Sequence, residues 1–311
     1  MSTQITASMV KELRDKTGAG MMDAKKALQE TDGDMEQAVQ LLRQKGMATA
    51  DKKSGRTAAE GLVIAKLSDN QKEGVLVELN CETDFVARGE DFGALAAELS
   101  GYALASTAND ADQFLKEQNP SGETFADYIK EKIGVIKENI TLRRLTRYKV
   151  GGSGTVCSYI HMGSKIGVLM DLETGDDSIL GNDTFLQLAK DLTMHVASCA
   201  PEFLSRDDIP ADVVEAEKQV EMGREDLQNK PVEIREKIVV GRLDKILGQR
   251  TLLEQPFVKD PSLKVIELLE QQGKALGQTV TVKRFVRYLL GEGIEKVQTN
   301  FADEVMAQVN A

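Results

Sequence analysis

Cys81, Glu82 and Asp84 place a thiol beside two carboxylates, which makes this the first segment to consider for catalysis. The thiolate is the reactive form of cysteine, and nearby carboxylates raise a thiol pKa and disfavour that form. Cys81 also shares the apolar side of a predicted strand with Leu79, which favours a buried structural cysteine. The alternative is a thiol-dependent enzyme centred on Cys81, in which Cys81→Ser abolishes activity.

The segment Thr17-Gly18-Ala19-Gly20 precedes a predicted helix, and glycines at a helix N-terminus can expose backbone N–H groups to a phosphate. No strand precedes it and no Gly-Lys-Ser/Thr follows, so a tight turn between two helices is the better interpretation. The two histidines, His161 and His195, have no nucleophile or acid at motif spacing, and the three cysteines have no paired spacing. The sequence therefore predicts no enzyme, no metal and no cofactor.

Two basic stretches could contact nucleic acid. One contains Arg143, Arg144, Arg147 and Lys149, and the other covers residues 52–56. The whole chain has 39 basic and 50 acidic residues and a net charge of −11, which disfavours a dedicated nucleic-acid binder. We expect ordinary solvated charge on connecting segments, with no direct nucleic-acid binding. An RNA- or ribosome-associated binding factor stays open as the alternative function.

The elements that position these residues begin with three short predicted helices. Thr6 and Asp34 are the expected N-caps of the first and third helices, and Gly46 is the expected end of the third. The small, polar and basic residues that follow, 48–56, indicate a linker. This part of the chain is therefore predicted to be a compact helical module.

A second style of sequence follows, in which residues 62–67 and 75–81 predict a β-hairpin and residues 92–104 a helix. The same plan recurs 93 positions later, where residues 167–172 align with 74–79 and Phe185 aligns with Phe92. The sequence therefore predicts two related lobes, each with strands and a helix.

Beyond the second lobe, Pro210 opens a helix and Pro231 follows a turn into a return helix. We expect an antiparallel helical hairpin in which small residues let the two backbones approach closely. The expected contact positions are Val213, Ala216, Val220, Gly223 and Leu227 on the first helix and Ile234, Ile238 and Gly241 on the return helix. Strand character returns in residues 280–290, and a last helix is expected after Thr299, with an apolar stripe of Phe301, Val305 and Val309.

The predicted fold is thus α+β and multidomain. No apolar run approaches the roughly 20 residues that cross a bilayer, and the N-terminus lacks a signal-peptide pattern, so a cytoplasmic protein without membrane contact is expected. The predicted domains are a three-helix module (1–55), a first core lobe (56–140), a second core lobe (141–203 and 253–293), an inserted helical hairpin (204–252) and a C-terminal helical segment (294–311).

The least usual local feature is Thr83-Asp84-Phe85-Val86, where a large apolar residue sits beside an acid in a predicted strand-to-helix loop. The positions 93 residues later are Asp176, Asp177, Ser178 and Ile179, so the repeated plan does not require an aromatic residue there. Two interpretations stay open: Phe85 inserts into a partner's pocket, or it caps the core of its own lobe.

Several motifs together resemble the bacterial elongation factor Ts family. They include Thr17-Gly18-Ala19-Gly20-Met21-Met22-Asp23, Asn80-Cys81-Glu82-Thr83-Asp84-Phe85-Val86-Ala87, Gln255-Pro256-Phe257-Val258 and Gly291-Glu292-Gly293-Ile294-Glu295-Lys296-Val297. The resemblance spans essentially the whole chain. It implies a ubiquitin-associated-like N-terminal module and a guanine nucleotide exchange factor that binds GDP-bound elongation factor Tu, promotes GDP release and lets GTP enter.

The same resemblance implies which residues contact the partner. Thr83, Asp84, Phe85 and Val86 would disturb its Mg²⁺ site, while Arg14, Met21, Met22 and Lys25 of the first module and His161 and Val258 of the second lobe would make further contacts. The helical hairpin would contact either the partner or a second copy, which leaves a homodimer or a 2:2 complex open. Two residues depart from the family pattern: Lys259 replaces a common methionine and Ala24 a common cysteine.

Overall fold

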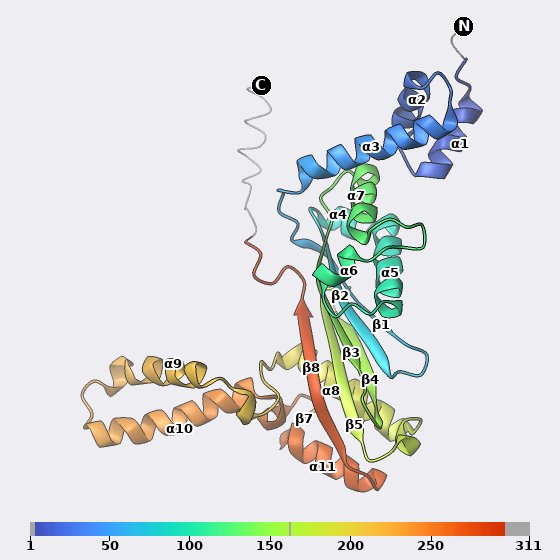
Figure 1. Cartoon of the computed structure of the whole chain (residues 1–311). Coiled ribbons are helices and arrows are strands. Elements are labelled where there is room, and N and C mark those ends of the chain that lie inside the picture. Colours follow the sequence, from blue (N-terminus) through green and yellow to red (C-terminus); the bar gives the residue numbers. More distant parts are fainter. Residues whose placement is uncertain (1–3, 162, 296–311) are drawn as a thin grey trace. The chain divides into compact units, whose positions relative to one another are not determined.

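The computed structural model describes residues 4–161 and 163–295, and it is a mixed α+β structure as the sequence predicts (Figure 1). The chain divides into two compact units. Unit 1 gathers the described residues of Met1–Ile64, Val77–Thr146 and Leu289–Ala311, and unit 2 comprises Ala65–Leu76 and Arg147–Tyr288. The finer domain boundaries stay predictions.

Unit 1 begins with three helices, α1 (Ala7–Thr17), α2 (Met21–Glu30) and α3 (Met35–Lys53). The Thr6 side chain accepts a hydrogen bond from the Met9 amide at 3.3 Å, so Thr6 is the N-cap of α1, and Asp34 caps α3 in the same way. Gly18 ends α1 with a φ of 69°, a left-handed conformation that glycine adopts without strain. The glycine segment is therefore the inter-helix turn that the sequence indicated.

Helix α3 does not end at Gly46, so the prediction of a helix stop and of a linker over 48–56 was wrong for all but its last residues. The helix continues to Lys53 and packs along α7 (Phe125–Ile136). A Cβ on Gly134 of α7 would lie only 2.5 Å from the Cα of Gly46. Gly46 therefore lies where the backbones of two helices meet, and a local sequence pattern cannot distinguish such a position from a helix end.

The predicted hairpin is present as β1 (Glu60–Leu67) and β2 (Glu73–Cys81), which lie in one sheet with β3 (Thr141–Lys149) in the order β1-β2-β3. Helices α4 (Asp84–Ala87), α5 (Glu90–Ala105) and α6 (Ala111–Lys116) connect these strands to α7. Strand β2 is buried on both faces rather than on the one predicted, because residues 74–81 are all inaccessible.

The basic cluster lies on strand β3, which corrects the prediction of solvated charge on a connecting segment. Arg143 and Arg144 both contact the fully buried carboxylate of Glu78, at 3.1 and 2.5 Å. The same carboxylate accepts a hydrogen bond from the Gly291 amide at 2.8 Å. These arginines therefore neutralise a buried acid of their own unit and fix the turn after β8 (Val280–Leu289).

Unit 2 repeats the plan, with β4 (Gly154–His161), β5 (Ile166–Thr174) and α8 (Asp183–Cys199). Strands β4 and β5 pair antiparallel, and the sheet order is β4-β5-β8. Gly61 and Gly154, again 93 positions apart, have φ values of 136° and 140°, and a Cβ would lie 2.1 Å from the Leu79 carbonyl oxygen in one copy and 2.0 Å from that of Leu172 in the other. The repeat thus extends to backbone details.

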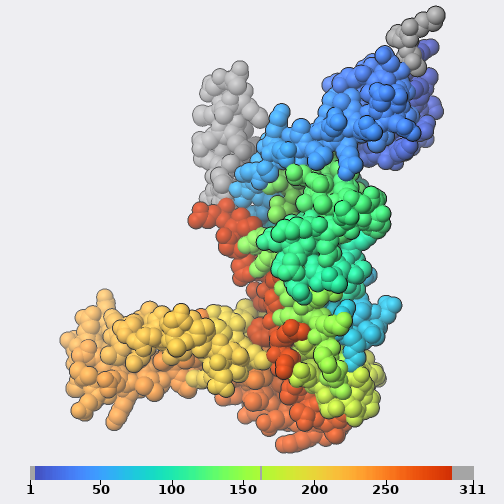
Figure 2. Space-filling view, in the orientation of Figure 1, coloured from blue at the N-terminus to red at the C-terminus, as the bar shows by residue number. Residues whose placement is uncertain are grey.

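The helical hairpin consists of α9 (Ala211–Met222), a 3₁₀ turn (Glu225–Leu227) and α10 (Val232–Arg250), and its two helices lie side by side and protrude from the rest of unit 2 (Figures 1 and 2). Its predicted contact positions were only partly right, because Leu227 is buried whereas Val220 and Ile234 are exposed and Gly241 faces open space. Val239 and Leu247 of α10 are also buried, and buried Glu221 pairs with Arg242 at 3.4 Å.

The remaining elements of unit 2 are the two-stranded sheet of β6 (Pro256–Phe257) and β7 (Asp260–Lys264) and the helix α11 (Val265–Leu276). Val265, Leu268 and Leu269 of α11 join the core formed by α8 and β5. The predicted last helix, with its cap at Thr299, lies outside the described residues, and so does nearly all of the predicted segment 294–311.

Candidate functional site

Thr83-Asp84-Phe85-Val86 forms the cap and first turn of the short helix α4, not a loop. The Thr83 hydroxyl is the N-cap and accepts a hydrogen bond from the Val86 amide at 3.3 Å. Ala87 is buried, whereas the Phe85 side chain is 85% exposed, the most exposed large hydrophobic side chain among the described residues. Of the two interpretations, capping of its own core is therefore wrong for Phe85.

The first turn of α4 is held by a carboxylate that sequence reasoning missed. Glu138 Oε2 accepts hydrogen bonds from the backbone amides of Glu82 and Thr83, at 3.1 and 3.0 Å. Its other oxygen accepts from the Thr83 hydroxyl at 2.6 Å. In return Glu82 Oε1 accepts from the Asn139 amide at 2.7 Å. The segments 82–83 and 138–139 are therefore joined by hydrogen bonds in both directions, each side supplying a carboxylate that accepts from the backbone of the other.

The carboxylate of Asp84, by contrast, forms an ion pair with a residue only four positions later in the chain. Its carboxylate pairs with Arg88 at 2.8 Å in an i,i+4 arrangement, and both side chains are well exposed. Such exposed pairs contribute little to stability, typically about 0.3–0.5 kcal/mol. Asp84 can therefore exchange Arg88 for another partner at low cost, which Thr83 cannot do.

The predicted contact residues of the N-terminal module are all exposed. Met21 and Met22 lie at the start of α2 with exposed fractions of 47% and 64%, and Lys25 follows one turn later on the same helix. Arg14 lies on α1 and its closest acid is its neighbour Asp15, at 3.9 Å. Two adjacent exposed methionines form a small adaptable apolar surface of the kind that suits protein contacts.

Ala24, one of the two departures from the family pattern, is fully buried in the core of the same module with Leu13 and Leu28. A position of this kind requires a small apolar side chain and takes no part in the exposed surface.

In unit 2, His161 and Val258 are also accessible. His161 lies at the end of β4, where its Nδ1 is 2.8 Å from the Tyr159 hydroxyl. Val258 follows β6, and its amide donates to Nδ1 of the buried His195 at 3.1 Å. Burial lowers the pKa of His195, so its ring is neutral and its Nε2–H donates to Gln255 at 2.9 Å. His195 is therefore a structural residue that fixes Val258.

Lys259, the other departure from the family pattern, has a local explanation. Its Nζ lies 2.6 Å from a carboxylate oxygen of Asp191 on α8, so the charge is paired although the side chain is about half exposed. A lysine at this position thus ties the chain after β6 to α8.

A protein-family model described as Elongation factor TS matches residues 82–292, which begins one residue before Thr83. Curated proteins named elongation factor Ts align over nearly the whole chain. The protein of Alkalilimnicola ehrlichii is 51% identical over 307 residues, covering 98% of both chains. That of Nostoc punctiforme is 47% identical over 311 residues, again with 98% of both covered. The chain belongs to the elongation factor Ts family.

This membership confirms the resemblance read from the motifs, and it extends over the N-terminal module as well. The matched family model excludes residues 1–81, but a Clostridium botulinum elongation factor Ts aligns with 98% of this chain at 45% identity. Both exposed segments of unit 1, around Met22 and around Phe85, therefore lie within the part of the chain that is similar to elongation factor Ts relatives.

The thiol chemistry considered first finds no support in this elongation factor Ts family member. Cys81 is fully buried, and its Sγ donates to the Thr83 carbonyl at 3.2 Å. Burial raises the pKa of Cys157 to about 12 and also raises that of Cys199, which keeps both thiols protonated. Among residues 4–161 and 163–295, no three His, Cys, Asp or Glu side chains are grouped so as to hold a metal ion.

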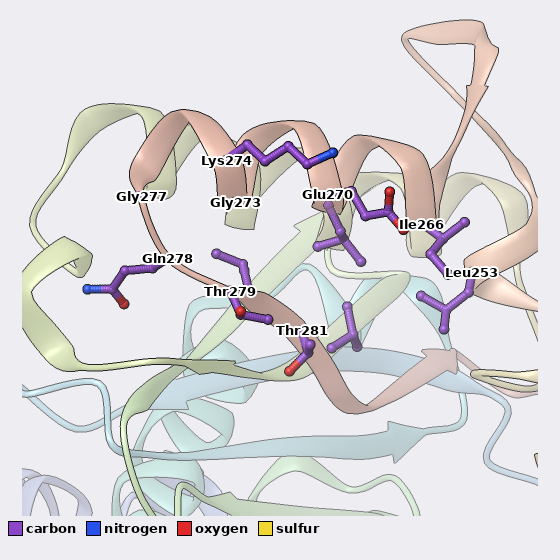
Figure 3. Close-up of a pocket in the computed structure, with 12 residues that line it drawn as sticks. Leu253, Ile266, Glu270, Gly273, Lys274, Gly277, Gln278, Thr279 and Thr281 are labelled. Carbon is purple, nitrogen blue, oxygen red and sulfur yellow. The ribbon is translucent and has the colours of Figure 1, made fainter.

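A pocket of about 710 Å³ lies in unit 2 between α11 and the start of β8. Figure 3 shows Glu270 and Lys274 of α11 on one side and Thr279 and Thr281 on the other. None of the residues implied by the elongation factor Ts family lines it. The pocket is thus separate from the candidate site.

No helix in the described ranges is long and apolar enough to cross a membrane.

Proposed function

We propose that this elongation factor Ts family member is a guanine nucleotide exchange factor. It binds elongation factor Tu in its GDP-bound form, disturbs the Mg²⁺ and phosphate site of that partner, and promotes GDP release and GTP loading. The protein makes and breaks no covalent bond itself, and it acts in the cytoplasm, where translation takes place. The observation that carries the proposal is the exposure of Phe85 on a braced helical turn in the segment that the family match covers.

The mechanism follows from reciprocal coupling between two ligands of one protein. A translation GTPase holds GDP through backbone amides and a Mg²⁺ ion, so a partner that binds best when these contacts are broken must weaken GDP binding. Insertion of the Phe85 ring into an apolar pocket supplies binding free energy that is available only in the displaced state. Asp84 can leave Arg88 to contact polar groups near the ion, because that pair is exposed.

Further contacts hold the partner while the site is disturbed. The module residues Arg14, Met21, Met22 and Lys25 and the second-lobe residues His161 and Val258 are all accessible, and we assign them to partner binding. The domain boundaries predicted from the sequence, including the hairpin of residues 204–252, belong to the same proposal. Whether the hairpin contacts the partner or a second copy is tested by the mass of the complex, since a 2:2 assembly has twice the mass of a 1:1 assembly.

The structure offers less to the RNA-binding alternative than the sequence did. Arg143 and Arg144 contact the buried carboxylate of Glu78, and Lys149 pairs with Glu73, so these cations are committed within the protein. Phosphate binding by this cluster would have to uncover a buried acid. No specific observation favours the alternative.

The test is the release of a fluorescent GDP analogue from elongation factor Tu after rapid mixing with this protein. We expect a large acceleration by the natural chain and a loss of about 1–3 kcal/mol of transition-state stabilisation for Phe85→Ala, a factor of roughly 5 to 150, as for an interface anchor. Leu186→Ala is the matched control, because Leu186 is exposed but lies on α8 outside every implied contact. No acceleration by the natural chain refutes the proposal, and full activity of Phe85→Ala refutes the role of its ring.

A further inference from the structure

The helix that presents Phe85 cannot fix its own orientation. Helix α4 has only four residues, Asp84–Ala87, and a single helical turn is not stable by itself. Its inward side offers one buried apolar contact, Ala87, because Phe85 points to solvent. The direction of the Phe85 side chain therefore depends on what holds the N-terminal end of the turn.

That end is held chiefly by Glu138. The carboxylate accepts two backbone N–H groups and the Thr83 hydroxyl, at 3.1, 3.0 and 2.6 Å. Hydrogen bonds to a charged acceptor are stronger than those between neutral groups. The Thr83 hydroxyl simultaneously accepts from the Val86 amide, so one chain of hydrogen bonds runs from Glu138 through Thr83 into the turn that carries Phe85.

Glu138 is itself anchored on both sides. The preceding residue, Lys137, ends α7 in a left-handed conformation with a φ of 66°, and its amide donates to the Ile133 carbonyl. The following residue, Asn139, donates its amide to Glu82 at 2.7 Å and its side-chain nitrogen to the Arg56 carbonyl at 2.8 Å. Helix α7 in turn meets α3 backbone to backbone at Gly134 and Gly46. The carboxylate is thus supported by rigid elements of unit 1.

We propose that Glu138 is a positioning residue for nucleotide exchange, which orients α4 so that Phe85 is presented to the partner before binding. The inference rests on the proposed function. Preorganisation of this kind removes the cost of ordering the segment during association or insertion. A substitution of Glu138 removes none of the proposed contact residues, Phe85 included. It only allows α4 to adopt other orientations.

Two substitutions of Glu138 separate geometry from charge. Glu138→Ala removes both acceptor oxygens and with them all three hydrogen bonds, whereas the side chain of Glu138→Gln can place its oxygen toward the two backbone amides and donate its NH₂ group to the Thr83 hydroxyl. We expect Glu138→Ala to lower the maximal rate of GDP release about tenfold, with a change below about twofold in the concentration that gives half of that rate, because the other contacts persist. Glu138→Gln should retain at least half of the natural maximal rate.

Asp110→Ala is the matched control for the loss of a structural carboxylate in the same unit. Asp110 caps α6 and accepts from the Gln113 amide at 2.8 Å, and it belongs to none of the proposed contact surfaces. We expect this variant to release GDP at the natural rate even where its thermal unfolding midpoint falls as far as that of Glu138→Ala. An equal loss of exchange in both variants would show a general effect of destabilisation and overturn the proposal.

The decisive experiment is a cycle with Phe85→Ala. If Glu138 acts through Phe85, adding Glu138→Ala to Phe85→Ala lowers the rate by less than about twofold, because the oriented group is already absent. If the two losses multiply in the double variant, or if Glu138→Ala alone exchanges at the natural rate, the proposal is overturned. These comparisons between variants can be made only if the natural chain accelerates GDP release. If the natural chain gives no acceleration, the proposed function is refuted instead.

Discussion

Gly134→Ala should destabilise unit 1, although alanine is the better helix former. A Cβ at this position of α7 would lie 2.5 Å from the Gly46 Cα and 3.3 Å from the Gly46 carbonyl carbon, both backbone atoms that cannot rotate away. The gain in helix propensity is about 1 kcal/mol. Separating two packed helices costs roughly 1–3 kcal/mol or more. The difference between this cost and the gain is a fall of up to about 2 kcal/mol in the free energy of unfolding, whereas the same substitution at an unhindered position would raise it.

Two other glycines supply the comparison. Gly101 lies inside α5 with nothing within 4 Å of an added Cβ, so Gly101→Ala should raise the free energy of unfolding by about 0.5–1 kcal/mol. At Gly46 the added Cβ would lie 3.6 Å from the Gly134 Cα, an ordinary contact, so Gly46→Ala should be neutral or slightly stabilising. The two sides of one helix crossing are thus expected to respond differently.

The assay is urea unfolding of the full chain followed by far-ultraviolet circular dichroism, with the free energy of unfolding compared among the three variants. If Gly134→Ala is as stable as Gly101→Ala, then α3 and α7 do not meet backbone to backbone and the explanation for the uninterrupted α3 is wrong. If Gly46→Ala is as damaging as Gly134→Ala, the asymmetry of the crossing is refuted.

Three further predictions concern buried charge, thiols and acid. Glu78→Gln should lower the free energy of unfolding by about 3 kcal/mol in the same urea assay, because two arginines lose a buried counter-charge. In the native protein at pH 8, a thiol reagent should leave Cys157, whose pKa is raised to about 12 by burial, unmodified while it reacts rapidly after unfolding. A hydrogen bond from Arg242 lowers the pKa of Asp226 from its ordinary 3.8 to about 2, so its stabilising contribution is present above pH 4 and disappears as the pH falls to 2. The difference in free energy of unfolding between the natural chain and Asp226→Asn should therefore shrink across that range, and a constant difference would contradict it.

The elements that the sequence predicted well are those with strong local signals. Capping residues such as Thr6 and Asp34 and the strand runs around Val77 and Val168 lie where expected, because a cap or a buried strand depends on a few neighbouring residues. The 93-residue repeat was visible for the same reason, since the two copies retain the same apolar positions.

The wrong predictions involve residues whose role depends on a distant segment. Gly46 resembles a helix end until α7 is placed against it. The Arg143 and Arg144 pair resembles solvated charge, because Glu78 is 65 and 66 residues away and nothing near it indicates that a carboxylate is buried there. In the hairpin, the contacting face was assigned from apolar spacing, whereas the buried Glu221 and its arginine partners occupy part of it.

Glu138 shows the same limit at the candidate site, because it lies 55 residues away from Thr83 along the chain. In the second copy, the corner equivalent to α4 is a 3₁₀ turn (Asp177–Ile179), in which Asp177 accepts a hydrogen bond from the Gly154 amide at 3.0 Å and pairs with Lys72 at 2.7 Å. The distant Gln278 also holds this corner, because its side-chain oxygen accepts from the Asp176 amide at 3.0 Å and its nitrogen donates to the Asp176 carboxylate at 2.6 Å. In the first copy Glu138 has the same role, since it accepts from the amide of Thr83, the residue equivalent to Asp176.

The two corners differ in the residues of the turn itself. Where the second copy uses two acids, Asp176 and Asp177, to hold its own turn, the first copy has Thr83 and an Asp84 that is held only by an exposed arginine. The next position is a serine in the second copy and the exposed Phe85 in the first. The two copies share their strands, helices and even the left-handed glycines, so a requirement of the fold cannot explain the aromatic residue. The departure from the repeat at an exposed position of a turn whose support is otherwise similar is therefore the physical reason for proposing that Phe85 contacts another molecule.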